Sequence, residues 1–233
     1  MNINSYKLLA FIAATALLPA IQPVHAQAGH SSPEEIEWTW EVRPTDYNPK
    51  LPNVLLLGDS ITRNYYPSVK RQLVGEANVY LMATSASVGD PRLPNQIVDF
   101  CKMEGVRFDI VHFNNGMHGW TYTEDDYRRA FPAFLGTIRA EAKGAQLIWA
   151  TTTPVKVDAN PGPTNSRVDA RNAIAKTFID AERIPIDDQH ELMMNHLDSY
   201  QDTVHFNESG SKIQGDQAGA KIKGMLSSLN QAR

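Results

Sequence analysis

The stretch Val54-Leu55-Leu56-Leu57-Gly58-Asp59-Ser60-Ile61-Thr62 decides the fold of this chain. Four apolar residues in a row are typical of a strand that is buried on both faces, and the glycine marks where that strand ends. Short apolar runs and segments of helical period alternate in the same way along the rest of the chain. This pattern predicts strands at residues 54–57, 79–82, 110–113, 147–150 and 184–186, and helices at 60–74, 93–103, 124–142, 168–181 and 208–229.

Regular alternation of strands and helices predicts an α/β fold, in which helices cover both faces of a parallel sheet. Ligands of such folds bind at the carboxyl ends of the strands. Polar loops follow the first, third and fourth predicted strands, at residues 58–60, 114–120 and 151–154. Because these three loops open on one edge of the sheet, we expect a functional site there.

Composition divides the chain into three segments. Residues 1–26 have one lysine, a short apolar core and Val24-His25-Ala26 at their end, which predicts a secretory signal peptide. The apolar core is about half the ~20 residues of a membrane-spanning helix, which argues against an uncleaved anchor. Residues 27–50 are polar and proline-rich, and we expect an irregular leader there, followed by one domain at 51–233. The predicted location is therefore the periplasm or the medium, with no membrane span after cleavage.

Charge and cysteine content exclude several classes of protein. The formal net charge is −4 and there is no basic run, which argues against a nucleic-acid partner. Cys101 is the single cysteine, so the chain has no internal disulfide, and its apolar neighbours predict a buried, inert thiol. Trp38 and Trp40 of the leader have two interpretations: they pack on the domain or they flank the site.

Ser60 stands where the first strand gives way to a helix, a position that suits either a helix N-cap or a nucleophile. A serine nucleophile needs a base and a group that orients the base. The segment Asp202-Thr203-Val204-His205 supplies both on one turn. Asp187 and His190 have the same spacing and form a rival pair. We favour Asp202 and His205, because the terminal helix that follows would clamp their loop against the sheet.

His118 lies in the loop after the third strand, in Asn114-Asn115-Gly116-Met117-His118-Gly119-Trp120. One interpretation is a surface histidine, but the surrounding glycines and asparagines favour a site role. The histidines of the chain show neither the His-Glu-x-x-His pattern nor a comparable ligand spacing. We therefore expect no metal site.

These segments, in this order, resemble the sequence blocks of the SGNH hydrolases, the GDSL-type esterases. The resemblance covers residues 53–225. Gly58-Asp59-Ser60 matches the first block, and Asp202-x-x-His205 matches the last. Gly89 is similar to the glycine of the second block. The third block of the family reads Gly-x-Asn-Asp, whereas Gly116-Met117-His118-Gly119 stands in its place here.

The resemblance implies a three-layer α/β/α sandwich with a five-stranded parallel, flavodoxin-like sheet. It implies ester hydrolysis through an acyl-enzyme without a cofactor, with Ser60, Asp202 and His205 as the triad. It also implies that an oxyanion hole is formed by Ser60, Gly89 and His118. Asn114 and Asn115 are alternative amide donors to His118.

The expected function is a serine esterase that removes small acyl groups, such as acetyl, from a carbohydrate or another polar ester. Trp120 and Tyr122 are candidates for substrate binding, because aromatic faces stack on sugar rings. The alternatives are a thioesterase or lysophospholipase with the same triad, and a non-catalytic carbohydrate-binding protein that retains the fold. The sequence does not indicate an acyl-chain preference or an oligomeric state.

Overall fold

The computed structural model describes residues 34–231 of the chain. The predicted signal peptide and the first part of the leader lie outside the described residues, so export stays a prediction. Within the described range, every helix is too short or too polar to cross a bilayer.

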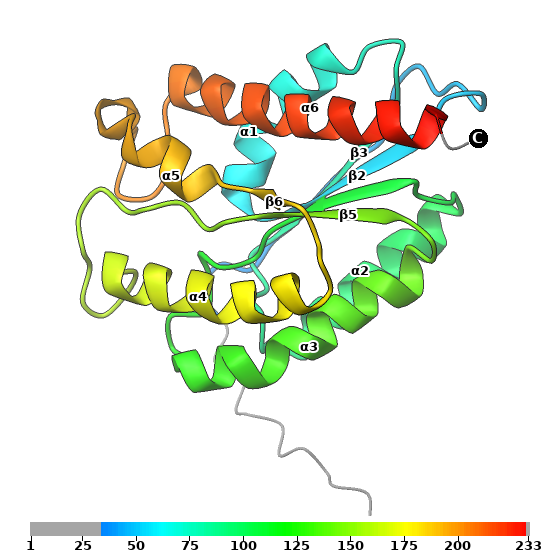
Figure 1. Ribbon diagram of the computed structural model, residues 1–233. Helices are drawn as coiled ribbons and strands as arrows, with labels where there is room; N and C mark the ends of the chain where they lie inside the picture. Colours follow the sequence, from blue (N-terminus) through cyan, green and yellow to red (C-terminus); the bar gives the residue numbers. More distant parts are fainter. Residues whose placement is uncertain (1–33, 232–233) are drawn as a thin grey trace, which may run out of the picture.

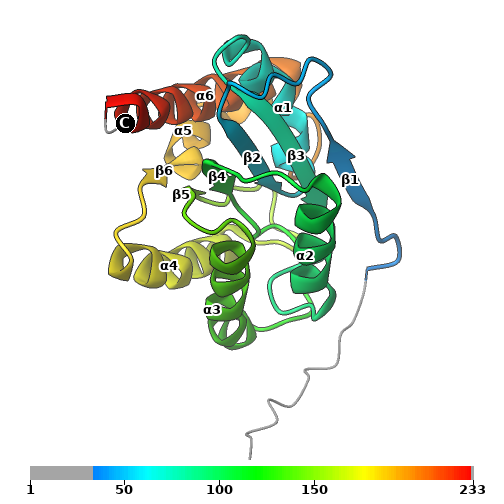
Figure 2. The ribbon, with the colours of Figure 1, turned by 90° about the vertical axis from the view of Figure 1, so that its right-hand side faces the viewer.

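Six strands form one sheet in the order β1-β3-β2-β4-β5-β6, as Figures 1 and 2 show. The five strands from β3 to β6 run parallel, and their order in the chain gives the flavodoxin-like arrangement. The five predicted parallel strands are therefore confirmed, within a sheet that has a sixth strand. The bounds of these strands are β2 (Asn53–Gly58), β3 (Asn78–Thr84), β4 (Ile110–Phe113), β5 (Gln146–Ala150) and β6 (Ile186–Asp187).

Helices cover both faces of the sheet, which makes the predicted three layers (Figure 1). One layer contains α1 (Ser60–Gln72), α5 (Gln189–Met194) and α6 (Glu208–Gln231). The other contains α2 (Arg92–Glu104), α3 (Glu124–Glu141) and α4 (Asn165–Ala181).

Residues 54–57 of the central strand β2 are all apolar because the two faces of the strand pack into two separate hydrophobic clusters. Leu55 and Leu57 belong to the cluster formed with α2, α3 and α4, whereas Val54 and Leu56 belong to the cluster formed with α1 and α6. Side chains of a strand alternate between its two faces, so neighbours in sequence enter opposite cores. Each of these four side chains is at most 2% exposed, and such burial stabilises the fold by about 1.5–3 kcal/mol per side chain.

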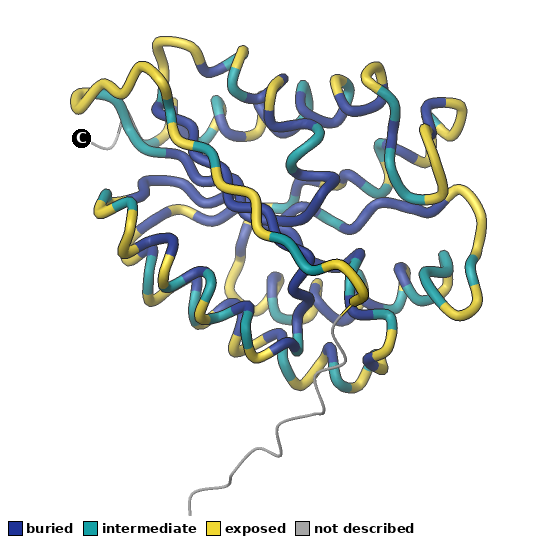
Figure 3. Tube along the Cα trace, turned by 180° about the vertical axis from the view of Figure 1, so that it is seen from behind, coloured by how far each residue is buried: buried dark blue, intermediate teal, exposed yellow. Residues whose placement is uncertain are grey.

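The leader is not irregular throughout, and the sheet is not purely parallel. Residues Thr39–Val42 form β1, an edge strand that pairs antiparallel with β3. All four residues of β1 are exposed or half-buried, and Figure 3 shows this segment running across the edge of the buried sheet. A strand that buries so little lacks the apolar run that revealed the other strands, so the sequence pattern missed it.

The fifth parallel strand begins later than the predicted range 184–186. The backbone N–H of Ile184 donates to the carbonyl of Ile179, so Ile184 still belongs to the turn that closes α4. Pro185 has no N–H to give to a sheet, although its carbonyl accepts from Trp149 of β5. Two short elements that the pattern did not predict follow: α5 and the 3₁₀ turn Leu197–Ser199.

Candidate active site

Ser60 stands at the carboxyl end of β2, at the first position of α1. Asp59 is the N-cap of this helix, since its Oδ1 accepts from the N–H of Ile61 at 2.9 Å. The N-cap interpretation of Ser60 is therefore wrong, because the neighbouring aspartate has that role. Gly58 is required for close approach: a Cβ there would lie 2.1 Å from Oγ1 of Thr62. The serine side chain is thus presented at the rim of the sheet, where the order of the strands changes direction between β2 and β4.

The structure brings Ser60, His205 and Asp202 into one chain of hydrogen bonds. Oγ of Ser60 lies 2.7 Å from Nε2 of His205, and Nδ1 of His205 lies 2.8 Å from Oδ2 of Asp202. When Nδ1–H donates to the carboxylate, the neutral imidazole offers a lone pair at Nε2. That nitrogen can accept the serine proton.

The loop that carries the base is tightly fixed. Oδ1 of Asp202 accepts from the backbone N–H groups of Val204 and His205 at 2.9 and 2.8 Å. Tyr200 and Phe206 close the loop with an antiparallel bridge just before α6 begins. Burial opposes ionisation of Asp202, but the N–H groups and the imidazole outweigh it, so the pKa of this carboxyl lies below its usual value. The acid therefore stays ionised and can orient the base.

The rival pair does not come together. Asp187 lies in the core, where its Oδ2 is 2.8 Å from Nε2 of His112 and also accepts from Gln189 at 2.9 Å. His190 instead places Nε2 at 3.2 Å from Oδ1 of Asp169. The sequence pattern does not indicate the His112–Asp187 pair, whose side chains are both fully buried.

Asn114 and Asn115 use their amides to hold the loops around the site. Nδ2 of Asn114 donates to the carbonyl of Ala150 at 2.6 Å and contacts Oγ1 of Thr152 at 3.2 Å. Nδ2 of Asn115 donates to the carbonyl of Ala86 at 2.8 Å, and its Oδ1 accepts from the N–H of Val88. Both side chains are buried. These contacts make a structural role the better interpretation of the two asparagines.

Gly89 follows β3 and has a φ of +104°, a conformation that disfavours any side chain. The ring of Tyr122 and the methyl of Ala130 stand 3.8 Å from where its Cβ would be. A neighbouring turn, with the N–H of Asp90 donating to the carbonyl of Ser87 at 2.9 Å, fixes the local backbone. Gly89 is thus a glycine by necessity at this strand end.

His118 is held by the leader. Its Nδ1 lies 2.8 Å from Oε1 of Glu34, and the ring of Trp38 meets the imidazole edge-on at 6.1 Å between centroids. Nε2 of His118 is buried and has no hydrogen-bond partner among the described residues. Burial lowers the pKa of His118, but the bond to Glu34 and the negative charges of Asp59, Glu34 and Glu37 outweigh it, so the pKa lies above its ordinary value.

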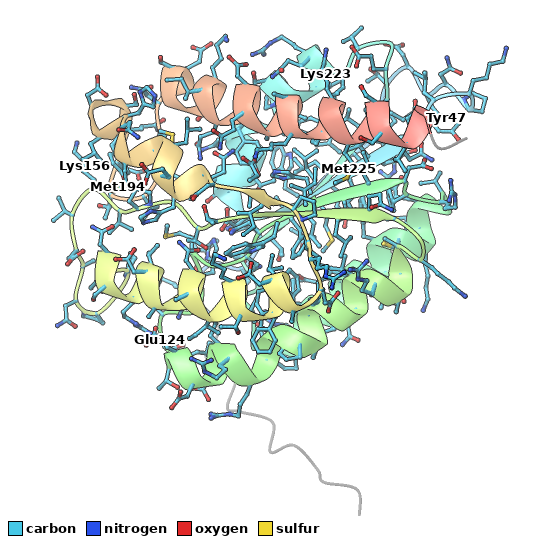
Figure 4. The ribbon with its side chains drawn as sticks, in the orientation of Figure 1. Tyr47, Glu124, Lys156, Met194, Lys223 and Met225 are labelled. Carbon is cyan, nitrogen blue, oxygen red and sulfur yellow. The ribbon has the colours of Figure 1, made fainter. Side chains whose placement is uncertain are left out.

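Arg171 of α4 holds the loop that carries His118, and sequence reasoning missed it. Its guanidinium is 1% exposed and donates to the carbonyls of Gly116, His118 and Gly119 at 3.1, 2.7 and 2.8 Å. Burial is the main cause that lowers the pKa of Arg171, to about 10. Glu124, labelled in Figure 4 at the start of α3, lies 3.5 Å from its Nε.

The two aromatic candidates for substrate binding differ in exposure. Trp120 is half-buried, and Arg171 lies over its ring at 4.0 Å from the centroid. Tyr122 is buried, and its hydroxyl has no hydrogen-bond partner within residues 34–231. Its carbonyl accepts from Arg167 at 2.6 Å. Among the described residues, no group of three histidine, cysteine or acidic side chains could hold a metal ion.

No protein-family model and no curated protein matches the chain. Solved structures do match. The chain has the fold of the SGNH hydrolases. A protein assigned to that family from Slackia heliotrinireducens superposes with a TM-score of 0.58 at 19% identity, covering 74% of this chain and all of the other.

Two further structures of this fold are esterases. An acetyl esterase variant, solved with an acetate ion, gives a TM-score of 0.61 at 17% identity and covers 77% of this chain and 100% of its own. A carbohydrate esterase of family 3 from Talaromyces cellulolyticus gives 0.59 at 18% identity, covering 76% and 99%. The predicted resemblance is therefore confirmed at the level of the fold.

Proposed function

We propose that this protein is a serine esterase of the SGNH type that removes small acyl groups, acetyl above all, from a carbohydrate or another polar ester. The observation that carries this proposal is the continuous hydrogen-bonded chain from Ser60 through His205 to Asp202, with distances of 2.7 and 2.8 Å. The acetyl esterase and the carbohydrate esterase of the same fold support acetylated carbohydrate as the substrate class. The predicted signal peptide supports a periplasmic or secreted location, which we also propose.

The proposed reaction has two steps. Oγ of Ser60 forms a bond to the ester carbonyl carbon while His205 takes the serine proton at Nε2. The resulting imidazolium, held by ionised Asp202, gives that proton to the alcohol oxygen as the ester C–O bond breaks. A water molecule then attacks the acyl-serine, again through His205, and releases the acid and the free serine.

We propose that the oxyanion of both steps is stabilised by the backbone N–H groups of Ser60 and Gly89 and by the side chain of His118. The N–H of Ser60 lies at a helix start, where backbone donors gather. His118 is suited to this role because its Nε2 is buried without a partner among the described residues. Since Nδ1–H donates to Glu34, Nε2 can donate only when the ring carries both protons. The donor is therefore the imidazolium form of His118.

Glu34→Gln is expected to move the alkaline limb of the pH–kcat profile to lower pH. A general base must be unprotonated to act, so activity should rise with pH on the acid side, and it should fall at higher pH as His118 loses the proton on Nε2. Glu34 raises the pKa of His118, so the neutral amide lowers that pKa and the fall begins earlier. The negative charges of Glu37 and Asp59 also raise the pKa of His118, and Arg171 contacts only its backbone carbonyl. The Glu34→Gln variant should therefore still show an alkaline limb, shifted to lower pH.

The measurement is initial-rate hydrolysis of p-nitrophenyl acetate across pH, corrected for spontaneous hydrolysis. Glu35→Gln is the matched control, because Glu35 is the exposed neighbour of Glu34 in the leader and is expected to leave both limbs in place. An alkaline limb that is absent from the unmodified protein, or unmoved in Glu34→Gln, would show that charged His118 does not stabilise the oxyanion.

The function itself is tested by a fluorophosphonate probe together with a panel of esters. We expect covalent labelling at Ser60, rapid hydrolysis of p-nitrophenyl acetate, slow or no hydrolysis of the palmitate ester, and release of acetate from acetylated xylan. A preference for acyl thioesters or lysophospholipids would favour the alternative hydrolases. Absence of both labelling and hydrolysis, with binding of xylan, would favour the non-catalytic carbohydrate-binding protein.

A further inference from the structure

A groove with a volume of about 460 Å³ opens directly beside the triad. It lies between α1 and the start of α6, which pack against each other, with α6 crossing in front of α1 in Figure 1, and the 201–206 loop forms its end. His205 is one of its lining residues, so the groove is continuous with the catalytic base. A substrate group that extends past His205 would enter this space.

The groove is cationic, although the protein as a whole is acidic with a formal net charge of −4. Arg63, Arg71 and Lys212 line it, and among the described residues Glu208 is the one acidic side chain in the lining. Lys212 forms an ion pair with Asp216, which weakens the electrostatic attraction between Lys212 and an anionic ligand. Arg71 lies near the same carboxylate, since its positive charge helps to lower the pKa of Asp216. Arg63 forms no side-chain hydrogen bond or ion pair with the described residues, so its charge is the least compensated in the groove.

Arg63 is pre-oriented by the leader. Its guanidinium lies over the rings of Trp38 and Trp40, at 5.3 and 5.2 Å from their centroids. Such stacking fixes the plane of the guanidinium and leaves its N–H groups at the edge free, which is the geometry that binds a carboxylate with two parallel hydrogen bonds. Arg63 also lies one helical turn after Ser60 in α1, on the same side of the helix. The leader thus fixes the guanidinium of a side chain that begins one turn from Ser60.

The chemistry of the triad decides which part of the ester meets the groove. His205 gives its proton to the alcohol oxygen as the ester bond breaks, so the alcohol lies on the His205 side of Ser60. The groove is on that side. The proposed oxyanion donors Gly89 and His118 are not among the residues that line the groove.

We propose that this groove binds a carboxylate on the alcohol part of the substrate, with Arg63 as the recognising side chain and Arg71 in support, which makes an acetylated uronic acid the preferred substrate class. The proposal rests on the esterase function proposed above. The substrate would be a charged sugar and not any acetylated sugar. Trp38 and Trp40 of the leader would serve to orient Arg63 toward it.

The test compares two acetylated methyl glycosides that differ only at C6: that of glucuronic acid, with a carboxylate, and that of glucose, with a hydroxymethyl group. We expect kcat/KM to be about tenfold or more higher for the glucuronide, through a lower KM, because hydrogen bonds to a charged acceptor are strong. The preference should shrink as salt is added, since the groove is open to solvent. Arg63→Gln should abolish it, and Arg71→Gln should reduce it.

Using the ratio of the two kcat/KM values cancels any general loss of activity in a variant. Arg128→Gln is the matched control, because it removes an exposed arginine from α3 on the opposite layer and should keep the ratio. A wild-type ratio near one, or a ratio unchanged in Arg63→Gln, would overturn the proposal while hydrolysis of p-nitrophenyl acetate still upheld the esterase.

If no ester at all were hydrolysed, calorimetric binding of the two unacetylated glycosides to the wild-type and Arg63→Gln proteins would decide. Preferential binding of the glucuronide that depends on Arg63 supports the groove, and equal binding refutes it.

Discussion

Ser60→Ala and His205→Ala are each expected to lower kcat on p-nitrophenyl acetate by about 10³-fold or more. The two side chains share one proton across a 2.7 Å contact, so either substitution removes the nucleophile or its activation. Because they act as a unit, the double variant should lose little more than either single one. The measurement is kcat by steady-state kinetics, with thermal unfolding to verify that each variant is folded.

His190→Ala is the matched control for the base. It removes a half-buried histidine from the rival Asp-x-x-His segment, whose Nε2 faces Asp169 and not Ser60. We expect kcat close to that of the wild type. Loss of activity in His190→Ala with full activity in His205→Ala would contradict the assignment of the base, and it would require the 201–206 loop to rearrange in solution.

The features that could be predicted from the sequence are β2 and the two turns of the site, because each depends on a few residues that are neighbours in the chain. Val54 to Leu57 are apolar in sequence because both faces of β2 are buried, so the run itself reveals the strand. The Gly58-Asp59-Ser60 turn and the Asp202-x-x-His205 turn are each a few residues long, and the same contacts that make them recognisable also hold their geometry. β1 escaped prediction because an exposed edge strand has no such pattern.

The supports of the site could not be predicted, because they join residues that are far apart in the chain. Glu34 contacts His118 across 84 positions, and Arg171 contacts the carbonyl of His118 across 53. An arginine within a helix normally marks a solvated face, yet Arg171 is almost fully buried. Only the fold shows that this charge holds the backbone of the 116–119 loop.

The role of His118 is tested by its removal. His118→Ala is expected to lower kcat by about 10²-fold, equivalent to about 2.7 kcal/mol, which is the effect of losing one oxyanion donor. KM should change much less, because the donor acts where charge develops in the transition state. The loop should keep its place in this variant, since Arg171 binds the carbonyls of Gly116 and Gly119 as well as that of residue 118.

His118→Asn sharpens this test, because it restores the residue that the SGNH hydrolases have at this point of the third block. An amide N–H donates without being ionised, so the variant should recover part of the activity lost in His118→Ala, and it should lack the alkaline limb that depends on the imidazolium. Glu34→Gln should then have no effect on the pH profile in the His118→Asn background, because the group that Glu34 charges is gone. His118→Ala could instead raise KM for bulky esters and leave kcat on p-nitrophenyl acetate unchanged. His118 would then contact the substrate without stabilising the oxyanion. The oxyanion would then be held by the backbone N–H groups of Ser60 and Gly89, and the amide of Asn115, which has one acceptor among the described residues for its two N–H groups, would be the side chain to test next. Asn114 already donates to Ala150 and contacts Thr152.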